Sequence, residues 1–433
     1  MHIFMALLYL FNYNTFMKKP YIWDQYSDQP HVLKDKAYKK AHKKLALASY
    51  IKTFFTSLIV LPLSLVAMPF VNRKVIKTNE FFCLGVDFER EVEESIKLIE
   101  ELNVIHILVR IKLWEIESLQ DLKYFLLKLD NKKITLKILQ DRENVIDLKL
   151  FTNNLTNIFH SLDGLVDIYE IGSTINRSKW GFFSVDEYNA FFKAAYDLKE
   201  KKFPTHTLIG SGVIDFEYHF TAHTLFNFFN YKYDGISALL YVDRRGAPEN
   251  MQFGFALSDK IAWLSTMIWL SKKTTQKLYL TETNWPLSNT APYAPTSEKE
   301  CVSVEVYADY MLRYYLLAFA SQQVDAVSWH QLIAPGYGLV DNRDGIQKYP
   351  AFQTYKTMYK HLHNAQFLRL DIKRGYYILQ CLVDDRLLQI HWTLKPTTLK
   401  NEANFEVYSR DGEIITDESL SIGSSPIYIY IKS

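Results

Sequence analysis

Between residues 81 and 329, short runs rich in β-branched and aromatic residues alternate with longer stretches of helical periodicity. This alternation is typical of repeated βαβ units, in which helices connect parallel strands. Eight runs have the length and composition of single strands. They are Phe81–Phe88, Ile105–Ile111, Lys133–Gln140, Val166–Ile171, Thr207–Ile214, Gly235–Val242, Lys277–Thr283 and Asp325–Trp329.

The repeat predicts a closed (β/α)₈ barrel, a fold that typically needs about 250 residues. Helical periodicity fills the gaps, for example in Glu298–Ser321 and Pro350–Leu362, and Ser184–Glu187 has the pattern of a capping box that opens a helix. The runner-up is a doubly wound open sheet, which would place a glycine-rich phosphate loop after the first strand. Gly85–Phe88 (GVDF) is not such a loop.

The chain is expected to have three parts: an N-terminal segment at 1–80, the barrel at 81–363 and a small antiparallel β-domain at 364–433. The last part is predicted from strand-like runs separated by turn residues such as Asp384 and Gly412. Those runs are Arg374–Gln380, Arg386–Thr393, Asn404–Tyr408 and Ile427–Lys432.

The N-terminal segment contains an uncharged apolar run, Thr53–Val71, close to the ~20 residues that span a bilayer. Pro62 and Pro69 interrupt it, and basic residues flank it on both sides. A membrane span, an interfacial anchor on anionic lipid and a helix buried against the barrel are therefore all open. We expect association with the inner membrane, on either its periplasmic or its cytoplasmic face. The flanking basic residues are Lys34, Lys36, Lys39, Lys40, Lys43, Lys44, Arg73, Lys74 and Lys77.

The balance of charge argues against a nucleic-acid partner, because 50 Lys and Arg stand against 48 Asp and Glu. The three cysteines are widely separated and form no zinc pattern. His219 and His223 have the spacing of two zinc ligands, but Phe220 stands where a zinc protease has its glutamate. No metal and no cofactor is predicted.

Glu282 is the strongest candidate for a catalytic residue. It lies at the end of the seventh predicted strand, in the segment Thr281–Pro286 (TETNWP). In a (β/α)₈ barrel, functional side chains gather where strands end. A carboxylate beside an aromatic ring suits glycosyl transfer, because the anion can attack or stabilise the anomeric carbon while the sugar packs on the ring.

The segment TETNWP resembles the strand-seven nucleophile segment of the large clan of retaining β-glycosidases with (β/α)₈ barrels. The resemblance covers residues 81–362, and the trailing β-domain resembles an appendage of several such families. It implies that Arg110, at the end of strand two, and Tyr241, at the end of strand six, orient Glu282 and lower its pKa. It also implies that Trp285 and Trp329 form a platform under the reacting sugar.

One position departs from the clan. Strand four of these enzymes usually ends in a Gly-Asn-Glu-Pro-like segment whose glutamate is the general acid and base. The matching segment here, Tyr169–Arg177 (YEIGSTINR), has Thr174 in that place, and threonine cannot protonate a leaving group near neutral pH. Glu170 is four residues earlier, roughly 13 Å below Thr174 along the strand, and is interpreted as a structural residue.

Three explanations stay open for the missing acid, whose loss typically costs ~10²–10⁴ in rate. Another carboxylate can supply the proton. An activated or phosphate-linked leaving group can depart without one. The site can also bind glycan without cleaving it. The candidate carboxylates are Asp141, Asp215, Glu217 and Asp243.

We therefore expect a glycoside hydrolase-like protein, a glycosidase or transglycosidase, that acts on O-glycosidic bonds of a cell-surface or lipid-linked glycan. The alternative is a non-catalytic glycan-binding or polysaccharide-assembly protein. The carbohydrate partner is an oligosaccharide or a glycan-lipid, with a membrane surface as a second partner. Expected substrate-binding residues are Trp285, Trp329, Asn176, Asp243, Thr174, Asn284 and His330.

Overall fold

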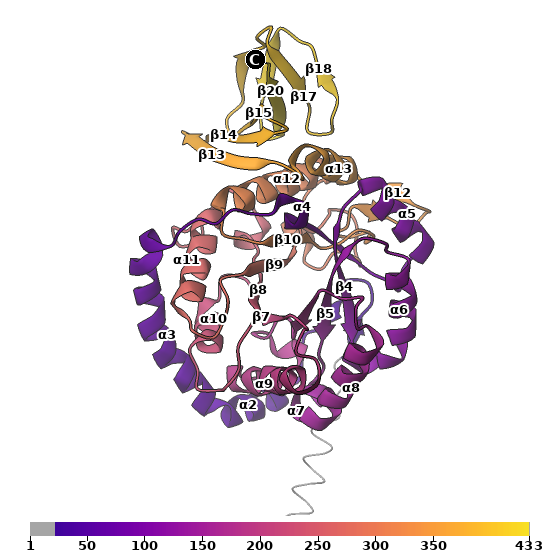
Figure 1. Ribbon diagram of the computed structural model, residues 1–433, viewed down its shortest axis with the longest axis vertical. Helices are drawn as coiled ribbons and strands as arrows, with labels where there is room; N and C mark the ends of the chain where they lie inside the picture. Colours follow the sequence, from indigo (N-terminus) through magenta and orange to yellow (C-terminus); the bar gives the residue numbers. More distant parts are fainter. Residues whose placement is uncertain (1–21, 433) are drawn as a thin grey trace, which may run out of the picture.

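The computed structural model describes residues 22–432, so the first 21 residues of the N-terminal segment lie outside the described part. The main body is a closed ring of parallel strands surrounded by helices (Figure 1). The ring closes where Val327 of the last strand pairs with Phe82 of the first. The barrel strands are β3 (Phe82–Val86), β4 (His106–Lys112), β5 (Lys133–Leu139), β6 (Ile168–Ile171), β7 (Leu208–Ile214), β8 (Gly235–Leu239), β9 (Leu278–Thr283) and β10 (Ala326–Trp329).

All eight predicted strands are confirmed, and the closed ring excludes the open doubly wound sheet. The strands are buried on both faces, which explains why their sequences read as continuous apolar runs. Helices connect the strands as the periodicity predicted, and two more flank the ring, α4 (Thr78–Phe81) before β3 and α13 (Pro350–Leu362) after β10. The connecting helices are α5 (Val92–Leu102), α6 (Leu119–Leu127), α7 (Arg142–Ile146), α8 (Leu148–Ser161), α9 (Val185–Lys202), α10 (Tyr218–Leu225), α11 (Leu257–Leu270) and α12 (Val304–Ser321).

Local sequence accounts for where these helices begin. The Ser184 side chain accepts a hydrogen bond from the Glu187 amide at 3.2 Å, so α9 starts where the capping motif predicted. Short 3₁₀ turns complete several loops at the carboxyl ends of the strands. They are η2 (Leu113–Ser118), η3 (Ser178–Trp180), η4 (Asp243–Arg245) and η5 (Glu298–Glu300).

The C-terminal β-domain is confirmed, and it sits on the side of the barrel formed by α12 and α13 (Figure 1). Arg410 holds it there, with Nη1 2.7 Å from Asp309 and Nη2 2.8 Å from Glu305, both on α12. Its main sheet has the order β13-β14-β15-β20-β17-β18, and β16 pairs with β19 in a separate two-stranded sheet. The strands of the domain are β13 (Gln366–Lys373), β14 (Tyr376–Val383), β15 (Arg386–Thr393), β16 (Thr397–Lys400), β17 (Phe405–Tyr408), β18 (Ile414–Ile415), β19 (Ser419–Ile422) and β20 (Ile427–Ile431).

The N-terminal apolar run forms a helix, α3 (Leu47–Ala67), that follows the short α2 (Lys36–Leu45) and lies along the outside of the barrel against α10 and α11 (Figure 1). Its inner face makes polar contacts. Thr53 Oγ1 is 2.8 Å from His223 Nδ1, and Trp263 Nε1 donates to Ser64 at 2.7 Å. Leu47–Phe70 is the one stretch among the described residues that is long and apolar enough to cross a membrane.

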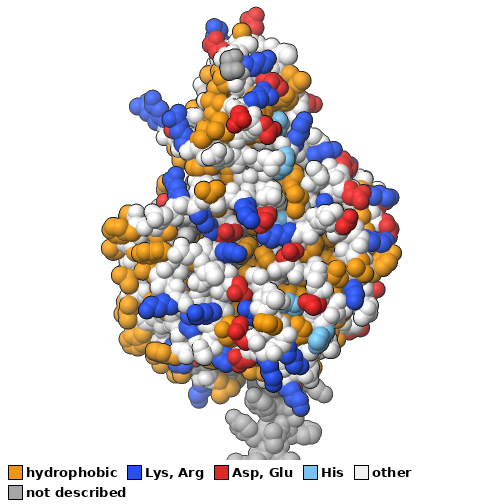
Figure 2. Space-filling view, in the orientation of Figure 1, with side chains coloured by type: hydrophobic (Ala, Val, Ile, Leu, Met, Phe, Trp, Pro, Cys, Tyr) orange, Lys and Arg blue, Asp and Glu red, His pale blue; other side chains and the backbone are white. Residues whose placement is uncertain are grey.

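The large side chains on the outer face of α3 are exposed. Figure 2 shows hydrophobic side chains gathered along the edge of the molecule where α3 runs in Figure 1. These residues recur at helical spacing and form a stripe, here named the α3 outer face. It consists of Leu47, Ile51, Phe54, Phe55, Leu58, Ile59, Leu63, Val66 and Phe70.

A short hairpin near the start of the described chain was not predicted. Its strands are β1 (Trp23–Asp24) and β2 (Gln29–Pro30). The Trp23 ring packs on Trp114 and Trp180, with centroids 5.3 and 5.9 Å apart, so the hairpin is fixed at the end of the barrel where the strands terminate. The boundaries proposed at residues 80 and 363 stay predictions, because segments on both sides of each pack against the barrel.

Candidate active site

Glu282 lies near the carboxyl end of β9, where its side chain is 16% exposed. The Tyr241 hydroxyl, two residues beyond β8, donates a hydrogen bond to Oε1 at 2.9 Å. The Lys137 ammonium on β5 is 3.4 Å from Oε2. Each oxygen of the Glu282 carboxylate therefore has its own partner, Tyr241 for Oε1 and Lys137 for Oε2. Together these two contacts fix the orientation of the carboxylate.

Lys137 stands between two carboxylates in the interior of the barrel. Its Nζ is 3.5 Å from Glu170 of β6 and 3.4 Å from Glu282 of β9. Glu170 is fully buried and also accepts a hydrogen bond from Thr281 at 2.9 Å. Burial raises the pKa of Glu170. The interpretation of Glu170 as an internal structural residue fits this geometry.

The electrostatic surroundings keep Glu282 ionised. Burial acts to raise its pKa, but the charge of Lys137 leads the opposing influences, and the result is a pKa of about 2 against an ordinary value of 4.5. The folded pKa is the lower one. The ionised form therefore stabilises the fold above pH 4.5, and this stabilisation is lost as the pH falls toward 2.

Glu282 opens into a cavity of about 150 Å³ at the barrel mouth. A cavity of roughly this volume can hold one six-membered ring, as in the case of benzene. Six of the ten predicted site residues line it: Glu282, Tyr241, Arg110, Thr174, Asn284 and His330. The other lining residues are Ser27, Asp28, Gln29, Arg177, Lys179, Trp180, Ile214, Arg245, Pro295 and Tyr337.

Thr174 faces this cavity at the position where the resemblance places the acid. Its backbone has φ of +53°, which a β-branched residue rarely adopts, and its side chain contacts only Ser173, at 3.3 Å, among the hydrogen bonds of the described chain. The departure from the clan pattern is therefore located at the site itself.

Trp285 and Trp329 do not form a sugar platform. Their rings stack on each other, with centroids 5.8 Å apart and planes at 18°, and they are 1% and 0% exposed. The Trp329 indole N–H is taken by Tyr307 at 2.7 Å. The prediction of a platform was wrong because an aromatic side chain at a strand end can point outward into the helix layer as readily as inward toward the cavity. Trp180 of η3 is the tryptophan that lines the cavity.

Asn176 and Asp243 lie outside the cavity lining. Asn176 ties two loops together: its Nδ2 donates to the Ile214 carbonyl at 2.9 Å and to Glu217 at 2.7 Å. Asp243 begins η4. Asn176 therefore has a structural role beside the site, and the substrate contact of Asp243 stays a prediction.

The other candidate acids are held away from the cavity. Arg177 pairs with Asp215 at 2.8 Å and with Glu217 at 2.7 Å. Asp141 caps α7, accepting from the Asn144 amide at 3.0 Å. In the described part of the chain, Glu282 and Asp28 are the two carboxylates that line the cavity.

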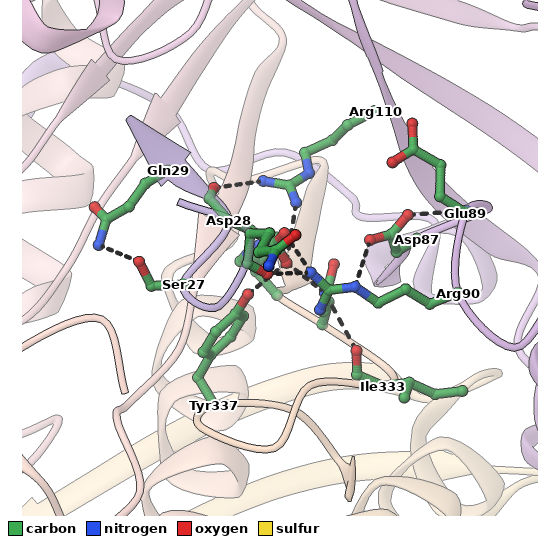
Figure 3. A network of polar contacts seen from close by, with 12 residues as sticks. Ser27, Asp28, Gln29, Asp87, Glu89, Arg90, Arg110, Ile333 and Tyr337 are labelled. Carbon is green, nitrogen blue, oxygen red and sulfur yellow. Dashed lines mark hydrogen bonds and ion pairs between the residues drawn. The ribbon is translucent and has the colours of Figure 1, made fainter. Parts of the chain in front are cut away.

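Asp28, at the tip of the hairpin, is the unexpected one (Figure 3). Arg90 donates to Oδ1 at 2.6 Å, and Oδ2 accepts from Tyr337 at 2.6 Å. Gln331 donates to the same Oδ2 at 3.1 Å, and Arg110 Nη2 lies 3.6 Å away. Burial raises the pKa of Asp28, and the two arginines oppose it. With both oxygens occupied, Asp28 anchors the hairpin and is not placed to pass a proton.

Arg110 lowers the pKa of Glu282, as the resemblance implied, but its influence comes after those of Lys137 and His330. Its guanidinium turns to Asp28, donating to the backbone carbonyl at 3.4 Å (Figure 3). Lys137 is the residue that forms the ion pair with Glu282, at 3.4 Å. A lysine in the middle of the apolar strand Lys133–Leu139 was the sequence signal for this partner.

The predicted site also lacked three cations of the cavity wall, Arg177, Lys179 of η3 and Arg245 of η4. Their sequence signal was weak, since surface loops are rich in charge. The His219 and His223 pair serves packing, because His223 bonds Thr53 of α3. Within residues 22–432, no group of three or more His, Cys, Asp or Glu side chains could hold a metal ion.

Comparison with known proteins finds no matching family model and no matching curated protein. Solved structures do match. A family 39 glycoside hydrolase from the gut symbiont Bacteroides cellulosilyticus WH2 has a TM-score of 0.65 at 14% identity, covering 83% of this chain and 82% of that one. A family 39 β-xylosidase from Caulobacter crescentus has a TM-score of 0.55 at 12% identity, covering 84% and 98%.

A family 30 endoxylanase from Clostridium papyrosolvens C71 has a TM-score of 0.56 at 8% identity, covering 83% of this chain and 97% of that one. Identities this low establish a shared fold and leave the activity open. The chain therefore has the (β/α)₈ barrel fold of these glycoside hydrolases, in a strongly divergent form, as the resemblance of its strand ends predicted.

Proposed function

We propose that this protein is a glycoside hydrolase-like enzyme in which Glu282 is the nucleophile toward one sugar ring in the cavity. The supporting observation is the state of Glu282: ionised, held by Tyr241 and Lys137, and open to a space of about 150 Å³. A carboxylate with these properties is what a covalent glycosyl-enzyme mechanism needs.

In the first step, Glu282 attacks the anomeric carbon, and the bond from that carbon to the leaving oxygen breaks. Since neither Thr174 nor Asp28 is suited to protonate that oxygen, the mechanism favours a leaving group that departs as an anion. Water or another sugar hydroxyl then attacks the anomeric carbon and loses its proton to solvent, and the bond from that carbon to Glu282 breaks to free the carboxylate. Hydrolysis and transglycosylation share this second step.

The hairpin makes the site a pocket and not an open groove. Ser27, Asp28 and Gln29 form part of its wall, and Trp23 fixes them there. A pocket with room for one ring suits the terminal residue of a glycan. We therefore propose action at a chain end, with a glycan-lipid among the candidate substrates.

Trapping experiments test the proposal. 2,4-Dinitrophenyl 2-deoxy-2-fluoro glycosides need no acid, because dinitrophenolate leaves unaided, and the fluorine slows release of the sugar. The full chain would be incubated with a panel of gluco, galacto, manno and xylo configurations. The hexoses would be tested both with a neutral C6 and with a C6 carboxylate. Intact mass should rise by one fluoro-sugar for at least one member.

One observation favours a second candidate function, that of a non-catalytic glycan-binding protein. Thr174 stands where the acid is expected, and within the described chain Asp28, with both oxygens bonded, is the other carboxylate that lines the cavity beside Glu282. The same panel separates the two functions. Binding of a parent sugar without labelling by any fluoro-glycoside of the panel would identify a binding protein. That result would contradict the proposed enzyme.

The ion pair between Lys137 and Glu282 gives a pH prediction. In the native protein, Glu282 has a pKa of about 2, so it stays ionised between pH 4 and 7. Its ionisation should therefore cause no change in the labelling rate over that range. Lys137→Met removes the cation between two carboxylates, so the pKa of Glu282 should rise and labelling should fall off on the acidic side. The Lys201→Met variant, on the exposed end of α9, should keep the native profile.

A profile of Lys137→Met that matches the native one would show that Lys137 does not set the ionisation of Glu282. Thermal unfolding of both variants at pH 7 controls for loss of fold, because Lys137 is buried and its removal also affects Glu170.

We also propose that the α3 outer face docks on a membrane surface. The helix is held along the barrel by Ser64 and Thr53, so it lies flat on the protein and presents its apolar stripe outward. This arrangement favours a helix that lies on the membrane surface, and not one that crosses the bilayer. The basic residues of α2 adjoin it, as expected for anionic lipid.

Replacing Phe55, Leu58 and Ile59 with glutamine should abolish co-flotation with vesicles of phosphatidylethanolamine and phosphatidylglycerol, since about 25 cal/mol of binding energy is lost per Å² of apolar surface. A matched control replaces the exposed Leu368, Ile372 and Ile414 of the β-domain with glutamine. Equal flotation of both triple variants would contradict docking through α3.

A further inference from the structure

Two cations in the cavity wall, Lys179 and Arg245, form no ion pair with any carboxylate of the described chain. Each other charged residue of the wall has a partner of opposite charge. Arg110 pairs with Asp28, and Glu282 pairs with Lys137. Arg177 pairs with both Asp215 and Glu217. Lys179 and Arg245 are therefore the two charged wall residues that no oppositely charged side chain of the described chain contacts.

Lys179 lies on η3, in the loop that follows β6 and carries Thr174. Its Nζ is held by a neutral partner, the Gln29 side-chain oxygen of the hairpin, at 2.5 Å. Burial lowers the pKa of Lys179 to about 8, and the charge of Glu282 acts against this shift. A partly buried ammonium without a counter-ion is costly, and a bound anion would remove that cost.

Arg245 comes from a different loop, at the end of η4. Its guanidinium carbon is 3.6 Å from the centroid of the Tyr241 ring, the same tyrosine that donates to Glu282. One nitrogen, Nη1, donates to the Asn284 carbonyl at 3.0 Å and its side-chain oxygen at 3.3 Å. No carboxylate of the described chain contacts its Nε or Nη2, so these nitrogens can bind a planar or tetrahedral oxyanion.

We propose that the sugar taken by this site carries an anionic group, a carboxylate or a phosphate, which Lys179 and Arg245 bind. This inference rests on the proposed function in assuming a sugar at Glu282. It adds the chemical class of that sugar, and it assigns two binding residues that the fold similarity does not supply.

An anomeric phosphate would also account for Thr174. When Glu282 attacks the anomeric carbon, the carbon–oxygen bond breaks, and the phosphate oxygen keeps the electron pair. Phosphate is stable as that anion, so no proton donor is needed, and a nearby cation replaces the acid. A carboxylate on the sugar ring would use the same cations to orient the ring, with another leaving group.

The test measures binding of defined probes to the full chain by ligand-observed NMR at low salt and pH 7. The probes are D-glucose 1-phosphate, D-glucuronate and methyl D-glucopyranoside, with their galacto and manno counterparts. At least one anionic probe should bind about tenfold or more tightly than its neutral counterpart, as expected for a charged hydrogen bond. Its affinity should fall as the pH rises above 8, because Lys179 loses its charge.

Lys179→Gln and Arg245→Gln should each lower the preference for the anionic probe over its neutral counterpart by about tenfold. Lys179→Arg should restore most of it, and Lys201→Gln on α9 should change nothing. A preference for the 1-phosphate identifies the leaving group as the anion, and a preference for the uronate identifies the ring substituent. Either result supports the inference.

Equal affinity for charged and neutral probes, or no effect of either glutamine variant, would overturn it. The fluoro-sugar panel keeps this failure separate from failure of the proposed function. Labelling of Glu282 by neutral members without any anionic preference would leave the enzyme proposal standing and remove only the anionic substrate. Absence of both binding and labelling would remove both.

Discussion

Replacing Glu282 with glutamine is expected to lower glycosyl transfer by at least about 10⁴-fold, the scale seen when a nucleophile is removed from an enzyme. Glutamine keeps the shape of the side chain and can still accept the hydrogen bond from Tyr241. It cannot form a stable glycosyl ester. The measurement is the release of dinitrophenolate from the aryl glycoside that labels the native protein.

Two controls separate loss of the nucleophile from other effects of the substitution. Glu143→Gln changes an exposed glutamate on α7 in the same way and should keep the native rate. The unfolding temperature of Glu282→Gln should stay near that of the native protein, although Lys137 loses one of its two carboxylate partners. A fully active Glu282→Gln variant would place the chemistry elsewhere in the barrel.

Replacing Asp28 with alanine is expected to destabilise the closed hairpin by about 3–5 kcal/mol, the usual cost of removing one partner from a buried ion pair. Arg90 and Arg110 would be left without their shared carboxylate, and Tyr337 would lose its acceptor. Figure 3 shows how these side chains converge on Asp28 from separate parts of the chain.

Hydrogen exchange measures this effect where it occurs. The His31 amide donates to the Ile22 carbonyl at 2.9 Å across the hairpin, and its protection should be lost in Asp28→Ala. Gln25→Ala, at an exposed position of the same hairpin, should leave protection near the native level. Native protection of His31 in Asp28→Ala would contradict the anchoring role. The variant would also have a wider cavity mouth.

The barrel could be predicted because its signals are local. Each strand is a buried apolar run, and several helices begin at a capping residue such as Ser184, so neighbouring residues suffice to find them. Glu282 could be predicted for a related reason, since its strand-end position determines where the side chain emerges. Tyr241 followed from the same rule on the strand beside it.

The rest of the site depends on contacts that no local pattern encodes. Asp28 reaches Tyr337 across 309 positions of the chain, and it changes the partner of Arg110. Trp285 and Trp329 have the expected positions, but their rings pack on each other and not on the cavity. The position of a residue along a strand can be predicted from the sequence. The direction of a side chain in a loop depends on how it packs in the folded protein.

The central claim is that Glu282 becomes bonded to the anomeric carbon. Fragmentation mass spectrometry of a protease digest of the fluoro-sugar-labelled protein tests it most directly. The account predicts a single modified peptide containing the segment Thr281–Pro286, with the added mass on Glu282. Label on another residue, or a protein that binds the parent sugar and acquires no label from any member of the panel, would contradict it.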